Sequence, residues 1–250
     1  MHSARPAIVV TGGSRGIGAA TVRALAADGY DIALAYHSDV AAAERVVAQA
    51  SASGARCVAV QADVSVPEDV ERLFDAAAQL GPVAGLVANA GLTAHIGDLA
   101  DTPVPAIRRV IDVNLIGAVL CSRRAAQVMS TARGGEGGTI VHVSSAAATL
   151  GSPHEYVHYA AAKAGVDALT VGLAKELAAE GVRVNAVAPG LVDTEIHAAA
   201  GRPDRIHTAA GRIPLGRAAQ VDEVTPAILW LLSPAAAYTT GTVIRVAGGL

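Results

Sequence analysis

Short runs of apolar, often β-branched residues alternate along this chain with longer, alanine-rich amphipathic segments. The runs expected to be strands are Ala7–Val10, Ile32–Tyr36, Cys57–Gln61, Leu86–Ala88, Thr139–Val143, Val182–Ala188 and Val243–Val246. Helical segments fill the intervals between them. This alternation predicts parallel strands joined by right-handed crossovers, with helices on both faces of the sheet. The sequence therefore indicates an α/β fold with a doubly wound sheet.

Glycines and polar residues gather directly after five of these runs. The five segments are Gly12 to Gly18, Asp63-Val64, Asn89-Ala90-Gly91, Ser144-Ser145 and Pro189-Gly190. The carboxyl ends of parallel strands meet at one edge of a sheet, and ligands of such sheets bind there. We therefore expect the five segments to surround one crevice.

The length of 250 residues suits a single α/β domain, which we expect to span residues 1–250. One stretch, Asp193 to Pro214, has no clear period and contains two glycines and two prolines. We expect this stretch to form a flap over the crevice.

Charge and cysteine usage narrow the range of partners. The formal net charge is -3 and no block of like charge occurs, which argues against nucleic acid and anionic membranes and favours a small-molecule substrate. The N-terminal apolar run is too short for a signal peptide, and no stretch is long enough to span a bilayer. Cys57 and Cys121 are isolated thiols, typical of a reducing compartment, so we expect a cytoplasmic protein.

The segment Thr11 to Gly18 follows the first strand and opens an alanine-rich helix. Its glycines let the backbone approach phosphate oxygens, and the amides and positive dipole end of the next helix favour negative charge. The spacing G-x-x-x-G-x-G differs from G-x-G-x-x-G, so the pattern by itself indicates only a phosphate site.

Tyr159 and Lys163 lie four residues apart near the start of the helix expected from Tyr156 to Glu180, so they share one face. A phenol that acts as an acid or base at neutral pH needs its pKa lowered by about three units, or about 4 kcal/mol. A cation about 4 Å away at an effective dielectric near 20 supplies roughly that energy. We therefore expect Lys163 to lower the pKa of Tyr159.

A different function is open because His154-Glu155-Tyr156-Val157-His158 matches H-E-x-x-H. On a helix this spacing places two imidazoles on one face for zinc, with Glu155 as the base of a hydrolase. Glu176 or Glu180 offers a third ligand. Pro153 instead indicates that the helix only begins here, so we favour a site without metal.

In the order of its motifs, the chain resembles the short-chain dehydrogenase/reductase family, which includes oxoacyl carrier-protein reductases and glucose dehydrogenases. The elements that carry the resemblance are Thr11 to Gly18, Asp63-Val64, Asn89-Ala90-Gly91, Asn114, Ser145, Tyr159 to Lys163, Pro189-Gly190 and Thr194. The resemblance implies a seven-stranded Rossmann sheet and hydride transfer between a nicotinamide coenzyme and a carbonyl or alcohol carbon.

The same resemblance assigns catalytic roles to four residues. Tyr159 is the acid in reduction and the base in oxidation, and Lys163 lowers its pKa and binds the nicotinamide ribose. Ser145 hydrogen-bonds the substrate oxygen, and Asn114 anchors a water in a proton relay to Lys163. A protein that senses NADP without turnover is an alternative, but sensing requires none of this proton chemistry.

The end of the second strand indicates which coenzyme binds. Tyr36-His37-Ser38 stands where an NAD enzyme would place a carboxylate, and Arg15 is available for a 2'-phosphate, so NADP is favoured. NAD stays open because Asp39 lies close by. By resemblance, Asp63 meets the adenine edge and Thr194 the carboxamide. The residues expected at the coenzyme are Gly12, Ser14, Arg15, Gly16, Ile17, Gly18, Tyr36, His37, Ser38, Asp63, Val64, Asn89, Ala90, Gly91, Tyr159, Lys163, Pro189, Gly190, Val192 and Thr194.

The substrate and the assembly are less constrained by the sequence. The residues expected to line the substrate pocket are His95, Ser145, His154, Tyr156 and Leu191, a mostly apolar set with histidine handles. An oxoacyl thioester, a small ketone or a sugar fits this description. The helices expected from Ala106 to Thr131 and from Tyr156 to Glu180 carry more small and apolar residues than one buried face requires, so with the resemblance they predict a homotetramer.

Overall fold

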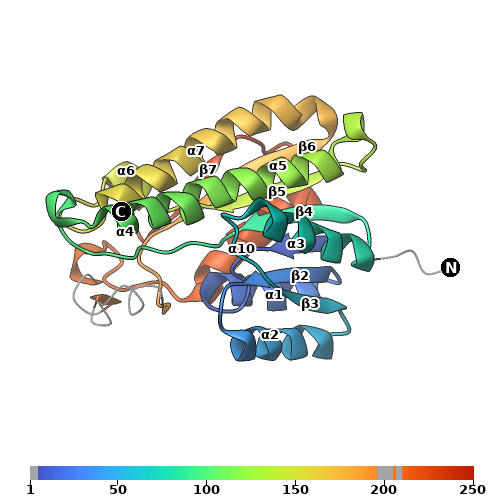
Figure 1. Cartoon of the computed structure of the whole chain (residues 1–250), viewed down its shortest axis with the longest axis horizontal. Coiled ribbons are helices and arrows are strands. Elements are labelled where there is room, and N and C mark those ends of the chain that lie inside the picture. The colour runs from blue at the N-terminus through green and yellow to red at the C-terminus, as the bar shows by residue number, and fades with distance from the viewer. Residues whose placement is uncertain (1–4, 196–204, 207–209) are drawn as a thin grey trace.

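One parallel sheet runs through the computed structural model, which describes residues 5–195, 205–206 and 210–250 (Figure 1). Within them the strands are β1 (Ala7–Val10), β2 (Asp31–Tyr36), β3 (Cys57–Gln61), β4 (Val83–Ala88), β5 (Gly138–Val143), β6 (Val182–Pro189) and β7 (Val243–Val246). The seven strands lie in the order β3-β2-β1-β4-β5-β6-β7, and each neighbouring pair is parallel. The predicted α/β sheet and all its expected strands are confirmed.

Helices cover both faces of this sheet, and the two faces bury alternate residues of each strand. The helices are α1 (Gly16–Ala27), α2 (Val40–Ala52), α3 (Pro67–Leu80), α4 (Val104–Ile111), α5 (Gly117–Met129), α6 (Ala147–Leu150), α7 (Val157–Leu177) and α10 (Val221–Leu232). Ile8 and Val10 pack in a core with α1, α2 and α10, whereas Val9 packs with α3, α5 and α7. Burial on both faces explains why the strands are continuous apolar runs. Figure 1 shows α5 and α7 side by side along one face.

The helix expected from Ala106 to Thr131 is divided in two. It begins at Val104, and a π-helical turn at Asp112–Ile116 separates α4 from α5, which ends at Met129. The wider turn contains Asn114, whose Nδ2 donates to the backbone oxygens of Leu92 at 2.7 Å and Val110 at 2.9 Å. Single π turns of this kind occur often at functional sites.

The chain order reverses beside β1, which lies between β2 and β4. The loops that leave β1 and β4 therefore diverge and open a crevice at the carboxyl ends of the strands. Asn89, after β4, donates from Nδ2 to the backbone oxygens of Thr11 at 2.9 Å and Gly12 at 3.0 Å. These two hydrogen bonds join the loop after β4 to the loop after β1 at the crevice.

Candidate active site

A cleft of about 480 Å³ lies at the ends of β1, β2 and β4. The expected coenzyme residues that line it are Gly12, Ser14, Arg15, Gly16, Ile17, Tyr36, His37, Ser38, Asp63, Val64, Asn89, Ala90, Gly91 and Thr194. Gly18 packs against Gly12 and Asn89 beside this lining. The remaining expected residues, Tyr159, Lys163, Pro189, Gly190 and Val192, lie outside it. The structure therefore brings most of the sequence-predicted set together around one cavity.

The glycine loop fits a diphosphate. A Cβ on Gly18 would lie 2.2 Å from the backbone oxygen of Gly12, so only glycine lets the loop fold this tightly. Helix α1 begins at Gly16 with no side-chain cap on Arg15 and no acidic residue in its first turn. Its first amides lack partners within the helix, so they and the helix dipole favour an anion at this position.

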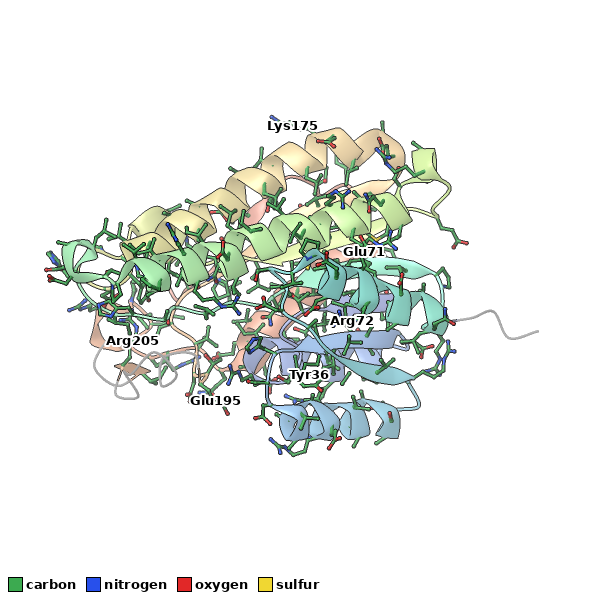
Figure 2. All side chains as sticks on the ribbon, viewed as in Figure 1. Tyr36, Glu71, Arg72, Lys175, Glu195 and Arg205 are labelled. Carbon is green, nitrogen blue, oxygen red and sulfur yellow. The ribbon has the colours of Figure 1, made fainter. Side chains whose placement is uncertain are left out.

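Tyr36, the last residue of β2, and His37 and Ser38 after it line the cleft, and none of the three is acidic. Asp39, which could have taken the place of an NAD-binding carboxylate, accepts a hydrogen bond from the backbone N of Ala42 at 2.9 Å and caps α2. The Arg15 side chain is 60% exposed and lies 3.8 Å from Glu195. Figure 2 labels Tyr36 and Glu195, which both line the cleft.

At the adenine end of the cleft, Asp63 is held by groups that the sequence did not reveal. The Arg109 guanidinium lies 2.8 Å from Asp63 Oδ2, and Ser65 donates to Oδ1 from its backbone N at 3.0 Å and its hydroxyl at 2.6 Å. Partial burial opposes ionisation, but these hydrogen bonds lower the pKa of Asp63 to about 2. Asp63 is therefore an ionised acceptor with a fixed orientation.

The phenol of Tyr159 is buried and faces Ser145. The hydroxyl of Ser145 hydrogen-bonds Tyr159, and it also accepts from the backbone N of Ala147 at 3.1 Å. The neighbouring Ser144 points elsewhere, because its hydroxyl donates to the backbone oxygen of Lys163 at 3.3 Å. The geometry therefore selects Ser145, as the sequence predicted, as the serine beside the phenol.

Lys163 is buried one helical turn after Tyr159. Its Nζ donates to the backbone oxygen of Val143 at 2.8 Å and lies 5.7 Å from the centre of the Tyr159 ring. Burial lowers the pKa of Lys163 to about 8, and the charge of Asp167 opposes this shift. A Cβ on Gly91 would lie 2.7 Å from Asn114 Oδ1 and 3.6 Å from Lys163 Nζ, so a glycine is required where these side chains meet.

The expected lowering of the Tyr159 pKa is wrong. Burial raises the pKa of Tyr159, and the hydrogen bond from Ser145 opposes the shift only in part. The Lys163 ammonium is directed at the Val143 carbonyl. Desolvation of the phenolate therefore outweighs the neighbouring cation.

A second, much smaller cavity lies behind the catalytic cluster. Its volume is about 10 Å³, and its lining includes Thr11, Asn114 and Lys163. A volume of roughly this size holds about one water molecule when polar groups surround it. Asn114 and Lys163 thus share a space that suits a single water.

The expected substrate residues separate into two groups. Tyr156 packs edge-on against Tyr159, with ring centres 5.2 Å apart, and its hydroxyl accepts from Arg205 at 2.7 Å. Leu191 and His95 are half-buried. His154 is instead 85% exposed and pairs with Asp98 at 2.8 Å, which directs it to the surface.

The flap expected from Asp193 to Pro214 falls partly on residues 196–204 and 207–209, which lie outside the described residues. Arg205 belongs to the part of this segment that the structure describes, and it is buried. It forms an ion pair with Glu155 at 2.7 Å and lies 4.9 Å from the centre of the Tyr156 ring. This residue of the segment, labelled in Figure 2, therefore contacts Glu155 and Tyr156 just before α7.

The zinc alternative is not supported by the geometry. Helix α7 begins only at Val157, so His154 is not one helical turn from His158. The backbone of His154 is left-handed, with φ 61, and Glu155 is paired with Arg205. Among the described residues, no three histidine, cysteine or acidic side chains are grouped to hold a metal ion.

Comparisons with known proteins agree with this geometry. A family model described as enoyl-(acyl carrier protein) reductase matches residues 12–250. The uncharacterized oxidoreductase YgfF of Escherichia coli K12 is 45% identical over 96% of this chain and 98% of its own, and the cis-4-hydroxycyclohexanecarboxylate dehydrogenase of Sinomonas cyclohexanicum is 43% identical over 96% and 94%. A crystal structure of a Burkholderia cenocepacia short chain dehydrogenase in complex with NADP has a TM-score of 0.89 at 34% identity, covering 99% of this chain and 98% of that one.

The chain belongs to the short-chain dehydrogenase/reductase family. The resemblance recognised in the sequence is therefore confirmed, together with the Rossmann-like sheet. The family uses NAD(P), and the protein is an oxidoreductase.

Proposed function

We propose that this oxidoreductase transfers a hydride between NADP(H) and a carbonyl or alcohol substrate, with Tyr159 as the acid and base. The convergence of Tyr159, Ser145 and Lys163 carries this proposal. This group adjoins the glycine-loop cleft at Gly91, which lines the cleft and where an added Cβ would lie 3.6 Å from Lys163 Nζ. The order of the motifs along the chain indicates the same three side chains. The protein would therefore be an alcohol dehydrogenase or carbonyl reductase acting on CH-OH groups.

The protein's own residues handle the proton. Bound NADP(H) supplies or accepts the hydride. In reduction the Tyr159 hydroxyl gives its proton to the substrate oxygen, while the Ser145 hydroxyl donates a hydrogen bond to that oxygen as negative charge develops. In oxidation Tyr159 takes the proton back. Lys163 holds the nicotinamide ribose, and Thr194 holds the carboxamide.

Proton supply to Tyr159 passes along Lys163 and Asn114 in this proposal. The small cavity that both residues line is the place for a relay water. Asn114 is held there by its bonds to Leu92 and Val110, so its side chain also braces the loop after β4.

NADP is the favoured coenzyme. None of Tyr36, His37 and Ser38 at the end of β2 is acidic, and Asp39 is engaged as a helix cap. Arg15 can leave the exposed Glu195 to pair with a 2'-phosphate. The solved Burkholderia relative holds NADP. NAD stays open as a second coenzyme until both are measured.

The substrate pocket lies beside Tyr156, Leu191 and His95. An oxoacyl thioester, a small ketone or a sugar remains the proposed substrate class. Because the Sinomonas relative is named for a hydroxylated cyclohexanecarboxylate, that compound belongs in the same panel. Screening ketones and alcohols with NADPH and NADP, then with NADH and NAD, tests the proposal by the change in coenzyme absorbance. Tight coenzyme binding without turnover of any compound would support the sensor alternative instead.

A homotetramer is the proposed assembly, and residues 1–250 are proposed as one dinucleotide-binding domain. Ile116 and Val119 beside and on α5, and Val157 and Val171 on α7, are large apolar residues left exposed by the single chain. Burial of these side chains against another copy would stabilise an oligomer. Light scattering should give about 100 kDa, four times 25.0 kDa. A 25.0 kDa species at micromolar concentration would contradict the tetramer.

The cysteines and the helices bear on the location of the protein and on its other partners. Cys57 and Cys121 are free thiols, which supports the cytoplasmic location proposed from the sequence. Among the described helices, none is long and apolar enough to cross a bilayer. No nucleic acid or membrane partner is proposed.

A further inference from the structure

We infer that Arg109 is a positioning residue for the coenzyme's adenine: it fixes the Asp63 carboxylate so that one acceptor site faces the exocyclic amine. The inference rests on the coenzyme placement proposed above. Arg109 comes from α4 and lines the cleft together with Asp63. It was not among the residues predicted from the sequence.

The acceptor sites of the Asp63 carboxylate are almost all occupied. An ionised carboxylate offers about four lone-pair sites. Ser65 fills both sites on Oδ1, with donors at 3.0 and 2.6 Å, and Arg109 fills one on Oδ2 at 2.8 Å. The next nitrogen, His37 Nε2, lies 3.9 Å from Oδ2, which is beyond hydrogen-bond distance. One acceptor site on Oδ2 therefore remains.

The remaining site sets a chemical preference. An acceptor-only group requires a donor, and adenine carries an exocyclic NH₂ at its edge. Hypoxanthine carries a carbonyl oxygen at the same position, which would face the carboxylate as a second acceptor. A fixed carboxylate therefore selects adenine, and a carboxylate free to rotate would select it less strongly.

Arg109 supplies this rigidity through two contacts. Its Nη2 pairs with Asp63 and its Nη1 donates to the Ser65 hydroxyl at 3.1 Å, so the guanidinium holds both the carboxylate and the hydroxyl that binds the carboxylate. The side chain is 38% exposed and has room to remain in this position beside a bound ring. Because its charge is already paired with Asp63, Arg109 is not a free cation for the coenzyme phosphates.

The test measures binding without turnover. Dissociation constants are determined for NADPH and for the reduced hypoxanthine analogue, by protein fluorescence or calorimetry, with no substrate present. We expect wild type to prefer NADPH on the order of tenfold or more. Arg109→Gln should weaken NADPH on the order of tenfold while changing the analogue by less than about twofold, so that the preference disappears.

Arg108→Gln is the matched control, because Arg108 is the neighbouring arginine on α4 and is exposed. It should retain the wild-type preference. Asp63→Asn should lose the preference, and Arg109→Gln should cost nothing further in that background if the two residues act as a unit. Arg109→Lys keeps the positive charge and should retain part of the preference for NADPH. Such partial rescue would show that Arg109→Gln loses the preference because the contact is lost and not because the protein fails to fold.

Equal weakening of both coenzymes by Arg109→Gln would overturn the inference, because Arg109 would then act as a general phosphate cation. Unchanged binding would overturn it as well. These outcomes are separate from failure of the proposed reaction, since loss of turnover at Tyr159 leaves the binding preference untouched.

Discussion

The ammonium of Lys163 lies 5.7 Å from the centre of the Tyr159 ring, yet it donates its hydrogen bond to the Val143 carbonyl and not to the phenol. The two side chains are close enough to interact, with the cation within about 6 Å of the ring. Burial nevertheless dominates the phenol and raises its pKa. Tyr159 is therefore a neutral, protonated acid, which is the form that reduction requires.

Replacing Tyr159 by Phe removes that acid without removing the ring that packs on Tyr156. We expect kcat to fall by about 10²- to 10⁴-fold, the usual contribution of a positioned general acid, with coenzyme affinity retained. The measurement is steady-state kinetics together with NADPH binding. Tyr238→Phe is the control, because Tyr238 is fully exposed and should behave as wild type. Unchanged turnover in Tyr159→Phe would place the acid elsewhere, with Tyr156 the first candidate.

The chain contains only two lysines, which makes the Lys163 ammonium directly observable. Lysine labelled with ¹³C at Cε should give two signals, one of which is assigned by its loss in Lys163→Ala. Because burial lowers the pKa of Lys163 to about 8, its signal should shift with a midpoint near pH 8. Lys175, which is exposed on α7, provides the comparison signal in the same sample (Figure 2).

The same labelled sample tests the role of Asp167. The carboxylate of Asp167 raises the pKa of Lys163, so Asp167→Asn should move the Lys163 midpoint to lower pH while the Lys175 signal stays where it was. A midpoint above pH 10 for Lys163 in the wild-type protein would show that the ammonium is solvated and not buried.

The sequence predicted the sheet well because parallel strands are buried on both faces. Val9 and Val10 face opposite cores, so every position of this strand is apolar and the hydrophobic run is continuous. Residues that follow strands, such as Gly18 and Asn89, were located because their position in the chain fixes their position at the edge of the sheet.

Contacts between segments far apart in sequence could not be predicted in this way. Arg109 meets Ser65 across 44 residues, and nothing in the local pattern of either segment indicates the partner. The π turn at Asn114 likewise depends on a bond to Leu92, 22 residues away. The predicted direction of the Tyr159 pKa shift was wrong. The four-residue spacing identifies Lys163 as a neighbour, but it does not show how completely the pair is buried.

Coenzyme choice should respond to a charge placed at the end of β2. Tyr36 lines the cleft there, and Tyr36→Asp would repel a 2'-phosphate and accept hydrogen bonds from ribose hydroxyls. The ratio of kcat/KM for NADP to that for NAD should fall on the order of tenfold to a hundredfold. Asparagine has the same shape as aspartate but no charge, so Tyr36→Asn should change this ratio much less than Tyr36→Asp does. A ratio that stays high in the aspartate variant would show that other groups hold the phosphate.

His142, on β5, is completely buried behind the site and hydrogen-bonded at both ring nitrogens. The Thr170 hydroxyl donates to the Val166 carbonyl, so its oxygen accepts from His142 Nδ1 at 2.8 Å. The other nitrogen, Nε2, then accepts from the Ser122 hydroxyl at 2.7 Å. These bonds place a proton on Nδ1, and complete burial, which lowers the pKa of His142, favours the neutral imidazole in which Nε2 accepts.

Acid should therefore destabilise the protein through this residue. Burial, aided by the Lys163 charge, lowers the pKa of His142 to about 3, against 6.5 for an unperturbed histidine. Between these two pKa values, His142 binds a proton in the unfolded chain but not in the folded chain. The contribution of neutral His142 to stability is therefore complete above about pH 6.5 and is lost as the pH falls towards about 3. The loss should be up to about 1.4 kcal/mol per pH unit in the free energy of unfolding.

Denaturant unfolding between pH 7 and pH 4.5 measures this slope above the range in which most carboxylates titrate. His142→Gln should flatten it, whereas His154→Gln, which removes an exposed histidine, should leave it nearly unchanged. Nitrogen NMR of the wild-type protein at pH 5 provides a reading that does not depend on the variant's stability, since His142 should remain neutral and carry its proton on Nδ1. A protonated His142 in folded protein at that pH would contradict the prediction, because the Ser122 hydroxyl could no longer donate to Nε2.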